Sequence, residues 1–298
     1  MKIRGFEEIT YGVEDMAECL RFCTDFGFEI ISQDERGATL GTLDGSLINL
    51  RHIDDPDLPA AIEPGSTLRQ VVLGVEDQET LDQIAAELSR DRAVTVAAGR
   101  VYSCDNAGLG LVFQIARKGP FIPPLPQANV PGHCQRPVNS RIAFEASVRP
   151  IGIAHVVINC ADEPSQRAFY TERLGYLVSD SFKEAGAFLR TPIAREHHSL
   201  FTVRRGANGL NHVAFYVTDF HEVMLGGTNM QKKGWKSYWG PGRHKLGSNY
   251  FWYIRSPLGG NLEYTCDVDH VDENWVPGEF DFSPDMTAIW SNRDFVSA

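Results

Sequence analysis

The length, composition and charge of the chain limit what it can be. It has 298 residues, 43% of them hydrophobic and 22% charged, which fits one large or two ordinary globular domains. With 28 basic against 39 acidic side chains the formal charge is −11, so we expect no nucleic-acid and no membrane partner, because both need basic residues to neutralise phosphate. Six scattered cysteines without CxxC spacing predict neither a zinc cluster nor a disulfide framework. We therefore expect a cytoplasmic protein that acts on a small molecule.

The first half opens with the pattern of a strand followed by a helix. Residues 8–13 are predicted to form a strand, and Met16–Phe26 an amphipathic helix. Gly27 directly after the helix is typical of a left-handed C-cap, and Phe28 opens the next strand. Two further strands are predicted near residues 70–77 and 105–113.

A proline-rich stretch separates two halves of the chain. Residues 118–149 contain six prolines, at positions where a helix or a central strand would be interrupted: Pro120, Pro123, Pro124, Pro126, Pro131 and Pro137. The sequence therefore predicts a domain at residues 1–117, a linker at 118–149 and a second domain at 150–267.

The second half repeats the order of the first. Residues 153–158 precede a helix predicted at 165–174 that ends at Gly175, and residues 212–219 and 256–264 match 70–77 and 105–113. Each half is thus predicted to contain two strand–helix–strands units, that is, paired βαβββ modules in an α+β fold. The tail, residues 268–298, is rich in aromatic side chains, and we expect it to pack on the body.

Three polar residues distinguish the second half from the first. The alignment of the halves sets His155, His212 and Glu263 against Thr10, Gln70 and Val112. Two imidazoles and one carboxylate on neighbouring strands form the facial triad that holds non-haem Fe(II) and leaves positions open for substrate and O2; Mn(II) suits the same ligands. A strand histidine taken singly is more often a core residue, but all three together predict a metal site.

With these ligands in place, the chain resembles the type I extradiol ring-cleavage dioxygenases of the vicinal oxygen chelate (glyoxalase/bleomycin resistance/dioxygenase) superfamily over essentially its full length. The resemblance rests on the triad and on two further segments, Glu196-His197-His198-Ser199-Leu200 and Gly240-Pro241-Gly242-Arg243-His244, the latter followed by Tyr253. It implies a metal-free first domain and a second domain that forms a barrel-like metal cleft. It also implies a homo-oligomer.

The resemblance implies roles for three side chains beside the metal. His198 would be the acid–base residue, and Tyr253 would hydrogen-bond the metal-bound hydroxyl or take its proton. His244 would donate a hydrogen bond to the oxyanion that develops on the substrate. The role of His197 stays open, and His221 and His270, which match nothing, are expected at the surface.

The second half is longer between residues 226 and 247, where an inserted loop is predicted. Its Trp235, Tyr238 and Trp239 either line a site for a flat apolar ring or form a packed surface hairpin. Some family members that take carboxylated catechols carry an arginine where this chain has Trp239, which favours an uncharged substrate. Lys232, Lys233 and Lys236 leave that question open.

The predicted function is that of an extradiol (meta-cleavage) dioxygenase, which opens the ring of a catechol-type diol with O2 at a mononuclear Fe(II). Three alternatives stay open. A hydroquinone-cleaving dioxygenase would use the same triad, and a lyase or isomerase of the superfamily would need the metal but not O2. A metal-free resistance protein that binds an aromatic compound would be expected to lack the triad.

Overall fold

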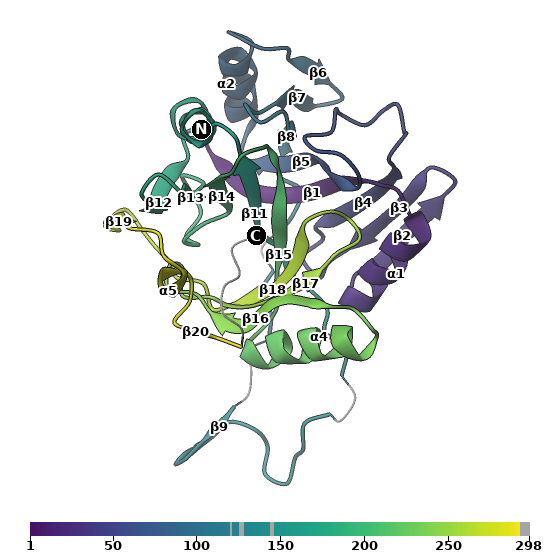
Figure 1. The fold of residues 1–298 in the computed structure, drawn as a ribbon, viewed down its shortest axis with the longest axis vertical. Helices are drawn as coiled ribbons and strands as arrows, with labels where there is room; N and C mark the ends of the chain where they lie inside the picture. The colour runs from purple at the N-terminus through teal and green to yellow at the C-terminus, as the bar shows by residue number, and fades with distance from the viewer. Residues whose placement is uncertain (120, 125–127, 144–145, 293–298) are drawn as a thin grey trace.

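The computed structural model describes residues 1–119, 121–124, 128–143 and 146–292. Two mixed β-sheets, of eight and ten strands, make up the body, and the helices pack on the outside of them (Figure 1). This confirms the α+β expectation. Among the described residues, no helix is both long and apolar enough to cross a lipid bilayer.

The first sheet contains two copies of a β-α-β-β-β unit. Its strands run in the order β2-β3-β4-β1-β5-β8-β7-β6, so the units meet where β1 pairs antiparallel with β5. The first and last strands of each unit pair in parallel. The elements are β1 (Ile3–Val13), α1 (Met16–Phe26), β2 (Glu29–Asp34), β3 (Gly37–Gly41), β4 (Leu47–His52), β5 (Thr67–Val75), α2 (Gln78–Leu88), β6 (Thr95–Ala97), β7 (Arg100–Cys104) and β8 (Gly110–Ile115).

The second sheet repeats this arrangement, which confirms the paired βαβββ modules. Its order is β19-β12-β13-β14-β11-β15-β18-β17-β16-β20, with β11 and β15 at the antiparallel junction. The elements are β11 (Gly152–Cys160), α3 (Glu163–Ala168), a π-helical turn (Phe169–Arg173), β12 (Leu177–Phe182), β13 (Gly186–Arg190), β14 (Leu200–Arg204), β15 (Gly209–Tyr216), α4 (Phe220–Lys232), β16 (Ser237–Arg243), β17 (Tyr250–Arg255) and β18 (Asn261–Cys266).

The segments outside the modules differ in how they contact the body. Between the two halves, β9 (Asn129–Val130) and β10 (His133–Cys134) form a small hairpin that projects away from both sheets (Figure 1). In the tail, β19 (Gly278–Phe280) and β20 (Trp290–Ser291) extend the two edges of the second sheet, with the short helix α5 (Pro284–Thr287) between them. The tail therefore passes over one face of the second module pair.

Local capping explains where the helices begin and end. Asp15 accepts a hydrogen bond from the Glu18 backbone N–H at the start of α1, and Gly27 closes that helix at φ 110°, as expected. Gly175 likewise lies in the left-handed region, at φ 76°. The helix predicted at residues 165–174 begins earlier, at Glu163, because the carboxylate of Asp162 caps it.

The prediction of an inserted loop at residues 226–247 is wrong, because much of this range has regular secondary structure. Its first part is the end of α4 and its later part is strand β16. The helix continues through Gly226 and Gly227, which pack directly against Tyr264 and Trp252, where a side chain would not fit. α4 therefore lies close against the second sheet.

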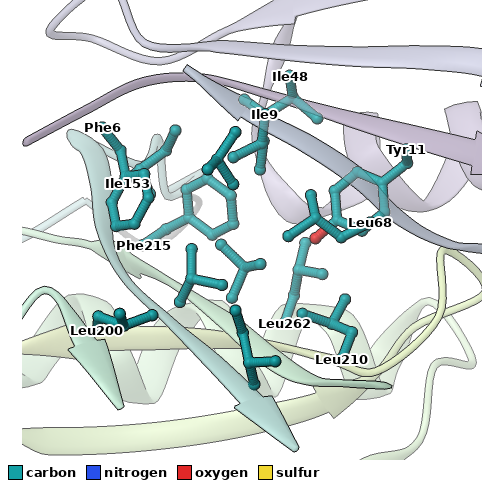
Figure 2. Close-up of a cluster of buried hydrophobic side chains, with 14 of the residues drawn as sticks. Phe6, Ile9, Tyr11, Ile48, Leu68, Ile153, Leu200, Leu210, Phe215 and Leu262 are labelled. Atoms are coloured by element: carbon teal, nitrogen blue, oxygen red, sulfur yellow. The ribbon is translucent and has the colours of Figure 1, made fainter. Parts of the chain in front are cut away.

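The two halves share one apolar core. Phe6, Ile9 and Leu68 from the first half face Ile153 and Phe215 from the second (Figure 2), and all five are at most 7% exposed. A continuous cluster of buried apolar side chains holds the two halves together in the same way as the core of a single domain.

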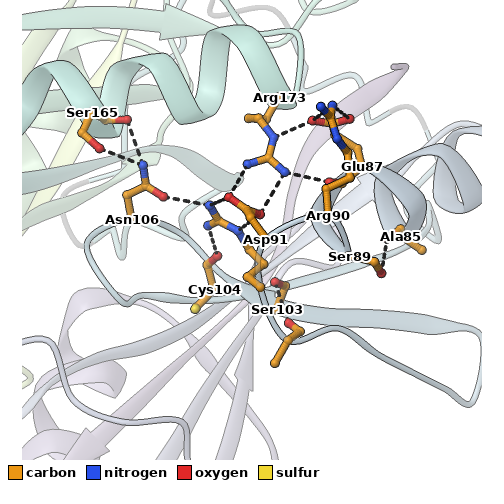
Figure 3. A network of polar contacts seen from close by, with 12 residues as sticks. Ala85, Glu87, Ser89, Arg90, Asp91, Ser103, Cys104, Asn106, Ser165 and Arg173 are labelled. Carbon is orange, nitrogen blue, oxygen red and sulfur yellow. Dashed lines mark hydrogen bonds and ion pairs between the residues drawn. The ribbon is translucent and has the colours of Figure 1, made fainter.

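Ion pairs and hydrogen bonds also connect the two halves at one edge of the interface between them. The Arg173 guanidinium pairs with Glu87 and, at 2.8 Å, with Asp91, both of the first half (Figure 3). The Asn106 side-chain amide donates to the Ser165 hydroxyl at 2.9 Å. These directional bonds fix the orientation of the first half against the second.

The strand registers correct the alignment of the halves. In the second half His155 lies opposite Ala214, and in the first half the residue opposite the equivalent Val72 is Glu8, not Thr10. Both strands carry a β-bulge at the same place, between Phe6 and Glu8 in β1 and between Ile153 and His155 in β11, so Glu8 and His155 are equivalent. The alignment of the sequences was off by two residues, an error that leaves the side chain on the same face. Glu8 pairs there with Arg100 at 2.8 Å, so an ion pair lies near the position that the metal ligands occupy in the other half.

Candidate active site

Three neighbouring strands bring the predicted ligands together. His155 projects from β11, His212 from β15 and Glu263 from β18, and these strands are adjacent in the sheet. The two Nε2 atoms are 3.2 Å apart, and each is 3.2 Å from Oε2 of Glu263. No other group of three or more such side chains in the described part of the chain brings its ligand atoms together in this way.

The three ligand atoms are arranged to bind a cation rather than to hydrogen-bond one another. Oε2 of Glu263 is buried and makes no hydrogen bond to any described residue, although both imidazoles are near it. Ligands on one face of an octahedral ion, at metal–ligand distances of about 2.1 Å, are separated by about 3 Å. The lone pairs therefore converge on a point at which a metal ion would satisfy all three.

The ionisation states favour ligation as well. Burial raises the pKa of Glu263, but His155 and His212 lower it further, so the carboxyl pKa is well below its usual range. Burial lowers the pKa of His212, which keeps its imidazole neutral. Nδ1 of His212 donates to Oδ1 of Asn211 at 2.8 Å, so the free lone pair is on Nε2.

Two buried histidines follow one another beside the triad, just before β14. The rings of His198 and His155 are 4.4 Å apart between centroids, and Nδ1 of His198 is 3.1 Å from Nδ1 of His197. The second nitrogen of His197 lies 3.0 Å from Oδ2 of Asp180, on β12. His197, whose role the sequence left open, is thus a fully buried residue between Asp180 and His198.

Tyr253 and His244 form a hydrogen-bonded pair on the other side of the triad. Tyr253 is the cross-strand partner of Glu263, on β17. His244 follows β16, and its Nδ1 donates to the Thr287 backbone carbonyl at 2.8 Å. Its Nε2 is therefore the acceptor for the Tyr253 hydroxyl, 3.0 Å away.

The side chains of His198, His244 and Tyr253 are all neutral near pH 7. Burial lowers the pKa of His198 well below its usual value, and lowers that of His244 to about 4. Burial, reinforced by the charge of Glu263, raises the pKa of the Tyr253 phenol well above its usual value. His198 is therefore unprotonated and has a free lone pair, and Tyr253 is a hydrogen-bonding group rather than a phenolate.

A cavity of about 420 Å³ opens onto these groups and is lined mainly by apolar side chains. His155, His212, His198, His244 and Tyr253 form its polar floor. The apolar wall consists of Phe182, Phe188, Phe201, Tyr238, Trp239, Leu246, Phe282 and Met286. Such a cavity suits a flat aromatic molecule.

Sequence reasoning placed some of these side chains and missed others. Tyr238 and Trp239 line the cavity, whereas Trp235 packs on Phe22 of α1 instead, and no lysine lines the cavity in the described chain. The stacked pair Phe188 and Phe201, 4.0 Å apart, was missed because strand aromatics look like ordinary core.

The cavity also has polar lining residues that were missed. Glu63, from the first half, lines it together with Arg205 and the asparagines Asn159, Asn208 and Asn211 of the second half. Glu63 accepts hydrogen bonds from Thr67 and from the Leu210 backbone, so the first half completes the wall. No motif marks a glutamate of this kind.

His221 and His270 are exposed, as expected.

Comparison with curated proteins places two relatives beside this chain. Metapyrocatechase 2 of Cupriavidus necator is 37% identical over 135 residues, which are 45% of this chain and 42% of the relative. The iron-dependent extradiol dioxygenase of Rhodococcus jostii (strain RHA1) is 26% identical over 142 residues, 43% of this chain and 47% of the relative. The matched segments thus span less than half the length of either relative. No protein-family model matches.

Solved structures match over nearly the whole chain. The Mn(II)-bound glyoxalase from Novosphingobium aromaticivorans superposes with a TM-score of 0.76 at 23% identity, covering 97% of this chain and 91% of that one. BphC, a halotolerant catechol dioxygenase, superposes with the same TM-score at 18% identity, covering 98% and 95%. The chain therefore has the fold that a glyoxalase and the extradiol dioxygenases share, and these matches support the resemblance drawn from the sequence.

Proposed function

We propose that this protein is an extradiol dioxygenase, which opens the ring of a catechol-type diol with O2 at a mononuclear Fe(II) held by His155, His212 and Glu263. One observation carries the proposal: the cluster of His155, His212 and Glu263 adjoins a largely apolar cavity that is also lined by three neutral side chains capable of proton transfer or hydrogen bonding. The two curated relatives, a metapyrocatechase and an iron-dependent extradiol dioxygenase, support it. Mn(II) would suit the same ligands.

The metal would supply a Lewis acid for the diol and a redox partner for O2. The protein's own residues then have separate tasks. His198 is neutral and can take a proton from the diol, then return it as an acid. Tyr253 donates a hydrogen bond to His244, so the lone pairs of its oxygen can accept a hydrogen bond from a diol hydroxyl and orient it.

The cavity wall defines the substrate class we propose. Its apolar side chains exclude water and favour an uncharged ring substituent. Arg205 and the asparagines also line the cavity and can hydrogen-bond polar groups of the substrate.

Oxygen uptake tests the proposal directly. The protein is reconstituted anaerobically with Fe(II), then mixed with O2 and catechol, 3-methylcatechol, 2,3-dihydroxybiphenyl or homoprotocatechuate. We expect stoichiometric uptake with a yellow ring-opened product, fastest for an uncharged diol. Uptake only with a 1,4-hydroquinone would favour the hydroquinone-cleaving alternative. No uptake with any diol by the iron-loaded protein would overturn the proposal and favour a lyase or isomerase of this fold.

Further expectations stay proposals beside this one. We propose that residues 1–117 form a metal-free domain, 118–149 a linker, 150–267 the catalytic domain and 268–298 a tail packed on it. A cytoplasmic location is supported by six free cysteines, which suit a reducing compartment. A homo-oligomer is the remaining proposal, which light scattering of the purified chain would test.

A further inference from the structure

We propose that Asp180 and His197 are positioning residues that fix the tautomer of His198 and leave its Nε2 unprotonated toward the cavity. The three side chains form one buried chain of contacts: Asp180 Oδ2 is 3.0 Å from His197 Nε2, and His197 Nδ1 is 3.1 Å from His198 Nδ1. None of the three is more than 6% exposed, so water does not compete for these contacts.

The direction of the hydrogen bonds follows from the carboxylate. A carboxylate can only accept, so Nε2 of His197 must carry a hydrogen and donate it. In a neutral imidazole the other nitrogen is then a bare acceptor, so Nδ1 of His197 receives a hydrogen from Nδ1 of His198. Nε2 of His198 is consequently left with its lone pair, which is the form that a general base needs.

The surrounding structure holds Asp180 and His197 in place. Oδ1 of Asp180 accepts from the Gly278 backbone N–H at 2.7 Å, so each carboxylate oxygen has its own donor. The His197 backbone N–H donates to the Asp269 carbonyl at 2.8 Å, and the Trp275 ring packs edge-on against the imidazole at 5.6 Å. The tail residues Gly278 and Trp275 therefore help to orient a pair that lies behind the cavity wall.

Replacement of Asp180 by asparagine is predicted to reverse the direction of the two hydrogen bonds that connect Asp180, His197 and His198. The Gly278 N–H requires an acceptor, so the amide oxygen must stay on that side and the amide NH2 must face His197. His197 then accepts on Nε2 and donates from Nδ1, and His198 must accept on Nδ1 and carry its hydrogen on Nε2. The Asp180→Asn variant keeps the shape of the site but removes the base.

The first experiment reads the tautomers without any turnover. The full-length chain is labelled with 15N-histidine and loaded with Zn2+, which is diamagnetic, and its imidazole nitrogens are observed by 15N NMR. The signal of His198 is assigned from its loss in His198→Phe. We expect a protonated Nδ1 and a bare Nε2 in the wild type and the opposite in Asp180→Asn. A protonated Nε2 in the wild type, or an unchanged tautomer in Asp180→Asn, would overturn the proposal.

The second experiment tests the consequence for turnover, which rests on the proposed ring cleavage. We expect kcat of iron-loaded Asp180→Asn to fall roughly 10²–10⁴-fold, with little change in KM, as for a base in the wrong tautomer. Asp281→Asn is the matched control, because it removes the same charge from an exposed side chain that pairs with Lys183 and not with His197. The control should keep the wild-type tautomers and kcat.

The two failures can be told apart. If the wild type turns over no diol, the proposed function is wrong, while the NMR result still decides the tautomer. If the wild type is active and Asp180→Asn matches it in kcat, the positioning role is wrong and the proposed function is unaffected.

Discussion

The hydroxyl of Tyr253 donates to Nε2 of His244 across 3.0 Å, and the direction of this bond is fixed by the Thr287 carbonyl on the other ring nitrogen. The backbone of the C-terminal tail thereby determines which atom of Tyr253 faces the substrate. A phenol that donates to His244 offers only its oxygen lone pairs to the cavity.

Tyr253→Phe should therefore lower kcat/KM by about 10-fold, the value of one buried hydrogen bond to substrate, with the metal content unchanged. Steady-state kinetics and metal analysis of the iron-loaded variant measure both quantities. Tyr250→Phe is the matched control, since it removes a hydroxyl from the same strand that bonds Arg243 rather than the site. Equal losses in the two variants would count against a role for Tyr253 at the diol.

Replacement of His198 by phenylalanine separates proton transfer from metal binding. The variant should bind iron as the wild type does, because His198 is not one of the three converging ligands. Its kcat should fall roughly 10²–10⁴-fold through loss of the base. Metal analysis and oxygen uptake on one preparation check this, and unchanged turnover would remove His198 from the mechanism.

Glu263 and Glu8 form a natural pair of test and control. Glu263→Ala should lose the metal, because it removes the single anionic ligand of the triad. Glu8→Gln should keep the metal and lose the ion pairs with Arg100 and Arg117, at a cost of about 1–2 kcal/mol in the free energy of unfolding. Metal content by elemental analysis and urea unfolding are the measurements. Full metal occupancy in Glu263→Ala would contradict the triad.

Much of the fold was readable from the sequence because the modules are repeated. Helix caps such as Gly27 and the strands around them recur at matching places, so two independent patterns supported each element. The alignment was nevertheless wrong by two residues at His155, whose counterpart is Glu8 rather than Thr10. The apolar pattern of a strand does not fix its alignment to the residue, but an error of two residues keeps a side chain on its face, so the ligand prediction was unaffected.

The contacts behind the site could not be predicted in the same way. Asp180 lies on β12, 17 residues before His197, and only the pairing of β12 with the tail strand β19 orients its carboxylate. Glu63 reaches the cavity from the other half of the chain. Such positions depend on long-range packing, which a pattern along one strand or helix does not contain.

The lowered pKa of His244, about 4 against an ordinary 6.5, predicts how acid affects stability. Between pH 6.5 and 4 the unfolded chain binds a proton at this side chain that the folded chain does not. The free energy of unfolding should therefore fall as the pH is lowered through that range, by at most about 1.4 kcal/mol per pH unit from this group. His244→Gln should show a shallower fall in urea unfolding, whereas the exposed His221→Gln should keep the wild-type slope. Identical slopes in both variants would contradict the assignment.

The close contact of α4 with the second sheet predicts the effect of a single methyl group. A Cβ on Gly227 would lie 2.1 Å from the Trp252 ring, which is buried and held by its hydrogen bond to the Ser237 hydroxyl. Alanine in place of a helical glycine ordinarily gains about 1 kcal/mol. Here we expect Gly227→Ala to lose about 1–3 kcal/mol in the free energy of unfolding, because the tryptophan cannot move aside. Urea unfolding measures the difference, and Gly206→Ala, where a Cβ meets open space, should change stability by less than about 0.5 kcal/mol. A gain in stability for Gly227→Ala would show that the ring has room to move and that the helix is not held tightly against β17.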